Sequence, residues 1–107
     1  MASSPVRVQY NASPKPTLEV ILSEPFLDIT VQDGVREAIN AHWREGLHMI
    51  SIDCRAVEFM DSSGVGLLVA LHKKLGGGPR RVQLKNVRSS IRSVFALLCL
   101  EDLFDFA

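Results

Sequence analysis

The sequence has little of what marks several large classes of protein. It holds only two cysteines, Cys54 and Cys99, too few for a disulfide framework, and neither has a second ligand at metal spacing. Twelve basic residues equal twelve acidic ones, so no net charge favours nucleic acid or an anionic membrane. No apolar run approaches the roughly 18 residues of a membrane span. We therefore expect two buried free thiols in a reducing compartment, no nucleic-acid partner and no membrane insertion.

Length and composition are those of one globular domain. With 107 residues, 47% of them hydrophobic and 22% charged, the chain can bury a core without a metal or disulfides. We expect a single domain over residues 1–107, with residues 1–5 flexible. Because this first segment is small and polar, unlike a signal peptide, we also expect a cytoplasmic protein.

Residues that enzymes and metal sites use are present, but their spacing is wrong for either. His42, His48 and His72 are scattered and make no metal pattern. Ser63 lacks the glycine that a nucleophile elbow places two residues before its serine. The glycine run at 76–78 is not followed by the lysine of a phosphate-binding loop. We expect no enzyme, no catalytic residue, no metal and no cofactor.

Hydrophobic periodicity predicts alternating strands and helices. Strands are expected over residues 6–10, 18–22, 49–54, 82–84 and 103–106, the first at an edge and antiparallel to the second. Helices are expected from Thr30 or Asp28 toward Gly46, over residues 62–75 with a stop at Gly76, and from Ser89 or Ser90 through Leu98. Strand–helix alternation from residue 49 onward implies parallel pairing through right-handed crossovers. The predicted fold is a small α/β domain with helices packed against a four- to five-stranded mixed sheet.

One segment, residues 58–68, concentrates the functional signal. A strand-like run at residues 57–60 ends in Asp61-Ser62-Ser63-Gly64, and an apolar segment of helix length follows at once. Serine hydroxyls at a helix start either cap the helix or help its free N–H groups to hold an anion such as phosphate. Gly64 and Gly66 lower helix propensity by about 1 kcal/mol each, which indicates that something approaches this backbone closely.

Residues 59–68, Phe-Met-Asp-Ser-Ser-Gly-Val-Gly-Leu-Leu, resemble the signature of STAS domains. This family includes bacterial anti-sigma-factor antagonists and the cytoplasmic domains of sulfate transporters. Residues 82–87 and the helix after them resemble the family as well. Phe26-Leu27-Asp28 is similar to the family's approach to its first helix, with Phe26 in place of an acidic residue and Pro25 as an extra one. The resemblance spans nearly the whole chain and implies a small STAS-like domain.

Among stand-alone antagonists of this family, the resemblance implies a phosphorylation switch. It assigns the phosphorylated serine to Ser62, directly after the motif aspartate Asp61. Ser63 would cap the helix, Gly64 would support the motif, and Asp28 would lie near the site. The residues expected to contact the partner lie along the helix and are Val65, Leu68, Val69 and His72. Apolar residues cover two faces of this helix, so either some of them are exposed for docking or both faces are buried.

Two partners follow from the resemblance: a serine-kinase anti-sigma factor, bound by the unphosphorylated form, and a metal-dependent serine phosphatase that resets the switch. We expect the protein itself to be a monomer. The alternative is a constitutive STAS adaptor subunit, in a lipid-transport ABC complex or a stress-signalling scaffold. Ser62 together with Ser63 favours the switch, because an adaptor needs no phosphoacceptor.

Overall fold

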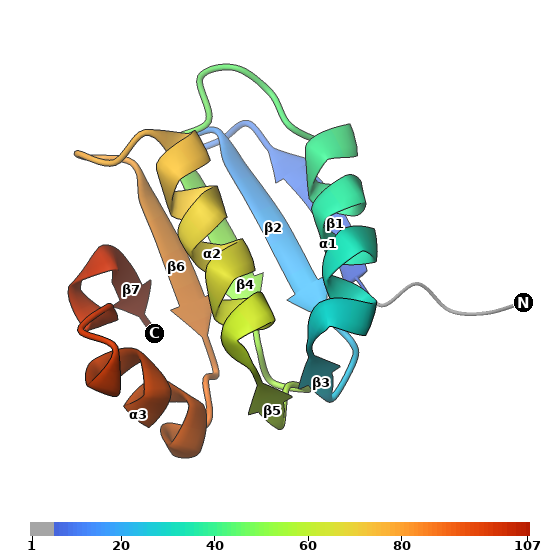
Figure 1. Ribbon diagram of the computed structural model, residues 1–107. Helices are drawn as coiled ribbons and strands as arrows, with labels where there is room; N and C mark the ends of the chain where they lie inside the picture. Colours follow the sequence, from blue (N-terminus) through green and yellow to red (C-terminus); the bar gives the residue numbers. More distant parts are fainter. Residues whose placement is uncertain (1–5) are drawn as a thin grey trace, which may run out of the picture.

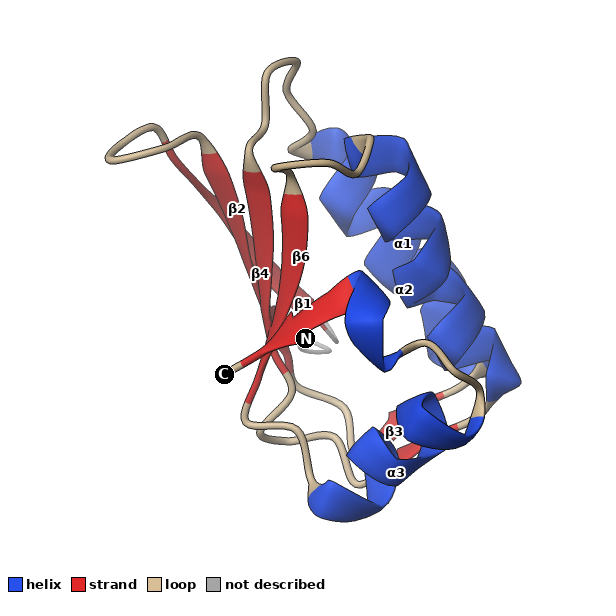
Figure 2. Cartoon of the chain, turned by 90° about the vertical axis from the view of Figure 1, so that its left-hand side faces the viewer, coloured by secondary structure: helices blue, strands red, loops and turns tan. Residues whose placement is uncertain are grey.

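Five strands form one sheet at the centre of the molecule, with helices on one side of it (Figures 1 and 2). This computed structural model describes residues 6–107, so the prediction for residues 1–5 lies outside the described residues. From edge to edge the strands are β1 (Val6–Asn11), β2 (Thr17–Leu22), β4 (Met49–Asp53), β6 (Arg81–Lys85) and β7 (Phe104–Phe106). β1 is antiparallel to β2, and the other neighbours in this sheet are parallel. The predicted mixed α/β sheet is confirmed.

The described chain has three α-helices, α1 (Ile29–Ala41), α2 (Ser62–Leu75) and α3 (Ser89–Leu97), and a short 3₁₀ turn, η1, at Glu101–Leu103. α2 has the predicted bounds, and Gly76 ends it in the left-handed conformation with a φ of 105°. α1 ends at Ala41, before the predicted stop, because Gly46 takes its positive φ only in the turn beyond.

α3 differs from its prediction at both ends. Neither Ser89 nor Ser90 caps it, because both are already helical; Arg88 is the N-cap residue and makes no side-chain capping bond. The last helical residue is Leu97, so Leu98 lies past the helix and is exposed.

A hydrophobic core fills the space between the helices and the sheet. Alternate residues of the central strands point into it, and α2 lies over the middle of the sheet in Figure 1. Because α2 also packs against α1 and β6, it buries apolar residues on more than one face: Val65, Leu67, Leu68, Leu71 and Leu75. Both faces are therefore mostly buried, and Val69 is the half-exposed exception among these apolar residues.

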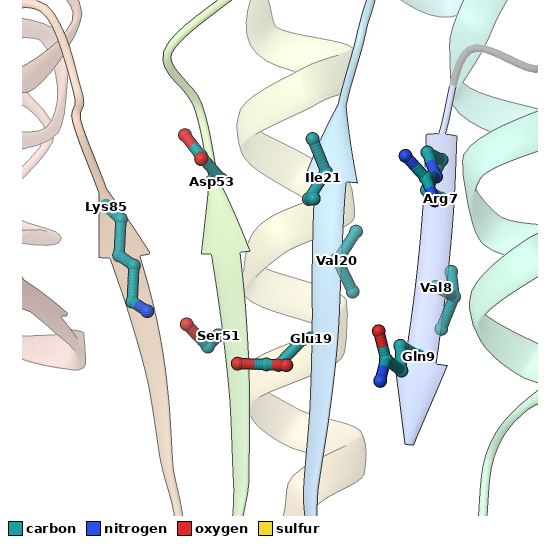
Figure 3. Close-up of a pocket in the computed structure, with 9 residues that line it drawn as sticks. All are labelled: Arg7, Val8, Gln9, Glu19, Val20, Ile21, Ser51, Asp53 and Lys85. Carbon is teal, nitrogen blue, oxygen red and sulfur yellow. The ribbon is translucent and has the colours of Figure 1, made fainter. Parts of the chain in front are cut away.

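The opposite face of the sheet carries polar side chains, and no helix of residues 6–107 covers it (Figures 2 and 3). Strand register puts Arg7, Ile21, Asp53 and Lys85 in one row across four strands. Together with Glu19 they line a shallow hollow of about 380 Å³. Positive and negative groups alternate here, as is typical of a solvated surface.

Two very short strands make a separate ribbon, β3 (Phe26–Leu27) with β5 (Phe59–Met60), paired in parallel. The predicted strand-like run at residues 57–60 thus becomes β5, but it joins β3 rather than the main sheet. In Figure 1 the ribbon lies at the end of the molecule where α1 and α2 begin.

The two cysteines differ in their surroundings. Cys54 is buried as predicted, and burial, with the neighbouring charge of Asp53, raises the pKa of its thiol to about 12. Cys99 is exposed, which corrects the prediction that both thiols are buried. Cys99 lies past the end of α3 and has a positive φ of 58°. The apolar residues before Cys99 could not reveal that the turn after α3 leaves this thiol at the surface.

Candidate functional site

The start of α2 is capped by Asp61 and not by a serine. Asp61 has extended backbone angles, and its carboxylate accepts hydrogen bonds from the backbone N–H groups of Ser63 (2.9 Å) and Gly64 (3.2 Å). The predicted caps, Ser62 and Ser63, are already helical residues, so their side chains do not reach back over the helix end. Within residues 6–107 neither serine hydroxyl makes a hydrogen bond, and Ser62 is exposed. The cap assignment to Ser63 is therefore wrong, and the exposed hydroxyl of Ser62 is not tied to the helix end.

Gly64 is required by a close approach within the chain itself. A Cβ atom added there would lie 2.4 Å from the carbonyl oxygen of Leu27 and 2.7 Å from Cγ of Met60. Both neighbours belong to the β3–β5 ribbon, so the ribbon holds the first turn of α2 in place. At Gly66 a Cβ would meet nothing within 4 Å. The close approach predicted from the two glycines is thus present at Gly64, while the space at Gly66 is open.

A second acidic N-cap lies beside the first. Asp28 caps α1 by accepting from the backbone N–H of Thr30 (2.9 Å) and from its hydroxyl (2.6 Å). The hydrogen bond from the Thr30 side chain, helped by backbone N–H groups, lowers the pKa of Asp28. Since Leu27 pairs with Met60, Asp28 and Asp61 are each one residue past the paired ends of β3 and β5. The starts of α1 and α2 therefore lie next to each other, and Asp28 is near the candidate site as expected.

Beside Ser62, a groove of about 430 Å³ runs between α2 and the segment after α3. Small or half-exposed residues of α2 form one wall, and Leu98 and Leu100 line the other. The residues on the α2 side are Ser62, Val65, Gly66, Val69, Ala70 and Lys73. The groove is lined mainly by apolar side chains and opens beside the free hydroxyl of Ser62.

The four residues predicted to contact a partner are not equally accessible. Val69 is half-buried and lines the groove, while Val65 is only 5% exposed at its floor. Leu68 is 1% exposed and belongs to the core. His72 is half-buried and turns toward β7, where its ring lies 6.2 Å from that of Phe104. Val69 is therefore the only one of the four that places a half-buried side chain in the groove.

Sequence reasoning missed the rest of the groove. The spacing of Ser62, Gly66, Ala70 and Lys73 along α2 marks one face of a helix, and that signal could have identified the exposed face. Leu98 and Leu100 carry no comparable signal, because they reach the groove only through the turn after α3.

Within residues 6–107, no three or more His, Cys, Asp or Glu side chains are grouped as they would be around a metal ion. None of the described helices has the length and apolar character needed to cross a membrane.

Comparison with known proteins agrees with the resemblance of the motif. The model of the STAS domain matches residues 13–107. The anti-sigma-B factor antagonist of Staphylococcus epidermidis is 29% identical over 77 residues, which are 72% of this chain and 71% of that protein.

Solved structures share the fold. The unphosphorylated anti-sigma factor antagonist SpoIIAA superposes with a TM-score of 0.72 at 26% identity, over 94% of this chain and 88% of that one. The phosphorylated form of SpoIIAA, a cell fate determinant of Bacillus, gives a TM-score of 0.67 at 25% identity, over 94% and 91%. An anti-sigma factor antagonist from Mycobacterium paratuberculosis gives 0.71 at 22% identity, over 98% and 87%, which supports the fold alone.

Proposed function

The chain belongs to the STAS domain family, and from this membership we propose that it is an anti-sigma-factor antagonist switched by phosphorylation of Ser62. In its unphosphorylated form it binds a serine-kinase anti-sigma factor and so frees a sigma factor. Phosphorylation of Ser62 by that kinase releases it, and a metal-dependent serine phosphatase restores the binding form. The names of the relatives support the role, and SpoIIAA, which exists in both forms, supports the switch.

The observation that carries this proposal is the free hydroxyl of Ser62. A serine that capped α2 would be tied to the helix backbone, and its modification would remove the cap. Here Asp61 caps instead, and Ser62 is exposed at the first position of the helix. A kinase can therefore modify Ser62 without dismantling the start of α2.

A phosphate on Ser62 would act mainly on the partner. It adds about −1.5 to −2 charges at pH 7. The N–H groups of Ser63 and Gly64, which could otherwise hold it, already donate to Asp61. The helix end still favours negative charge, but the Asp61 carboxylate beside it repels the phosphate. The new charge therefore points toward solvent and toward whatever packs against this end of α2.

The groove beside Ser62 is the surface on which we place the partner. Val69 contributes to it directly, whereas Val65 and Leu68 support it from within and His72 steadies the other end of α2 against β7. Gly66 leaves open space in the middle of this wall, although a glycine there weakens the helix. Internal packing does not explain that glycine, and a closely approaching partner does.

Phosphoryl transfer is the direct test of the site. The purified protein is incubated with the serine-kinase anti-sigma factor of its own organism and ATP, and mass spectrometry locates the phosphate. Ser62→Ala should abolish incorporation, and the matched control Ser63→Ala should leave most of it. Phosphate on Ser63 of the wild type would show that the wrong serine was assigned.

Binding separates the switch from a constitutive adaptor. Ser62→Asp places a carboxylate beside Asp61 in a contact made for a neutral hydroxyl, at a cost of a few kcal/mol. At about 2.7 kcal/mol the affinity for the kinase falls roughly a hundredfold. Calorimetry at matched salt compares this variant with wild type. Equal affinities would refute the switch and favour an adaptor held elsewhere on its surface.

A further inference from the structure

An exposed aromatic pair lies at the same end of the molecule as Ser62 and has no role in the core. Phe26 of β3 and Phe59 of β5 are register partners, and their rings meet edge to face with centroids 6.2 Å apart. They are 52% and 51% exposed, and Ile29 at the start of α1 is 70% exposed. Their strand neighbours Leu27 and Met60, by contrast, are buried. We call Phe26, Ile29 and Phe59 the aromatic patch.

The charged residues of the ribbon and its flanks all have one sign. Residues 23–30 and 57–63, which form the ribbon and its flanks, contain four acidic residues and no basic one: Glu24, Asp28, Glu58 and Asp61. Asp28 and Asp61 serve as helix caps. Glu24 and Glu58 make no ion pair or side-chain hydrogen bond with residues 6–107, and they precede the two strands whose rings touch. Arg88 reaches only the edge of this region, where it donates to the backbone carbonyl of Val57 (3.2 Å).

The ribbon also holds the aromatic patch rigidly to the phosphorylation site. Asp61 N–H donates to the carbonyl of Leu27 (3.4 Å), and Gly64 packs directly onto the same carbonyl. A partner seated on the two rings is therefore positioned relative to Ser62 by a stiff connection rather than by a loop. A half-exposed ring pair of this kind is the usual anchor of a protein–protein contact.

We infer that the aromatic patch is a second contact for the proposed kinase partner, which inserts an apolar side chain against Phe26 and Phe59 and sets a lysine or arginine opposite Glu24 and Glu58. This inference rests on the proposed function and deepens it. The patch is apolar and rigid, so it supplies anchoring. A basic group opposite the two glutamates keeps them paired when the partner covers them, speeds encounter and discriminates among partners.

The test compares point variants with matched controls against the purified serine-kinase anti-sigma factor of the same organism. Phe26→Ala and Phe59→Ala should each raise Kd at least about tenfold. The control Ile21→Ala, a 46% exposed apolar residue on the open sheet face, should leave Kd unchanged. Thermal melting of each variant shows whether it remains folded.

A second pair of variants keeps the test informative should either Phe variant fail to fold. Glu24→Gln with Glu58→Gln changes only exposed groups, and it should lower the association rate and flatten its salt dependence. Glu37→Gln with Glu45→Gln, equally exposed and equal in charge, should change the association rate much less.

Each outcome decides the inference. Suppose that wild type binds the kinase, and that the two Phe variants and the double Glu→Gln variant bind as tightly and as fast as wild type. The inference then fails, while the proposed function stands. If wild type does not bind the kinase at all, both fail. Suppose instead that wild type self-associates in analytical ultracentrifugation while Phe26→Ala stays monomeric. That result would assign the aromatic patch to a contact with a second copy of the chain and overturn the inference.

Discussion

The same substitution, glycine to alanine, can be made at two positions near the start of α2, and we expect opposite effects on stability. Gly64→Ala and Gly66→Ala add the same methyl group two residues apart. At Gly64 the new Cβ would lie 2.4 Å from the Leu27 carbonyl oxygen, a backbone atom that cannot rotate away. At Gly66 it would meet nothing within 4 Å.

The magnitudes follow from packing and helix propensity. An alanine gains up to about 1 kcal/mol over glycine in a helix. Overpacking costs about 1–3 kcal/mol or more, because α2 must move off the ribbon. Gly64→Ala should therefore be destabilised on balance, by about 1–2 kcal/mol, while Gly66→Ala should be stabilised by up to about 1 kcal/mol. For a domain of this size, 1 kcal/mol corresponds to a shift in Tm of roughly 4–8 °C.

Thermal and urea unfolding measure the stability of both variants, and calorimetry against the kinase partner measures their binding. Gly66→Ala should bind more weakly even though it is more stable, because its methyl group occupies the groove beside Ser62. Loss of stability in Gly66→Ala, or a Gly64→Ala protein as stable as wild type, would refute this account of the two positions. Unchanged binding by Gly66→Ala would remove the groove from the partner surface.

Other predictions concern the caps and the thiols. Asp61→Ala removes the cap of α2 and should lower the unfolding free energy by about 0.5–2 kcal/mol in urea titrations, whereas Ser62→Asp should stay within about 1 kcal/mol of wild type in the same assay. Ellman's reagent at pH 8 should modify Cys99 quickly and Cys54 only after unfolding, since the Cys54 thiol is buried with a pKa of about 12; two fast thiols would contradict this. The lowered pKa of Asp28 means that its stabilising effect is fully present above its ordinary value of 3.8 and is lost as the pH falls through the lower folded value. Asp28→Asn should therefore flatten acid unfolding curves below about pH 4, and an unchanged curve would count against the Asp28 cap.

The local pattern of the chain was enough to predict most of its elements. The sequence predicts α2 from Ser62 to Leu75, and the helix has those bounds. The segment after residue 66 contains no glycine until Gly76, which ends the helix. The parallel pairing of β4 with β6 followed from the strand–helix–strand order, because such a unit in one sheet forms a right-handed crossover between parallel strands. The choice of Ser62 as the phosphorylated residue came from the resemblance of the motif to the STAS family, and it remains a proposal.

Other features depended on contacts between distant segments. β3 and β5 are two residues long, too short for any period to predict, and they pair only because the chain brings Phe26 beside Phe59. The groove needed Leu98 and Leu100 from beyond α3.

The two glycines of the motif, Gly64 and Gly66, show most clearly which features the sequence determines and which the tertiary structure determines. Helix propensity alone indicates that both glycines weaken α2, so the presence of a glycine at each position has to be explained by something else. The reason at Gly64 is a carbonyl 37 residues earlier in the chain, at Leu27, whereas at Gly66 the surface is open and no neighbour within 4 Å requires a glycine. Sequence determines which backbone is unusual, because propensity is a local property. Only the tertiary structure decides what lies against that backbone, because close approach depends on how segments far apart in the chain pack together.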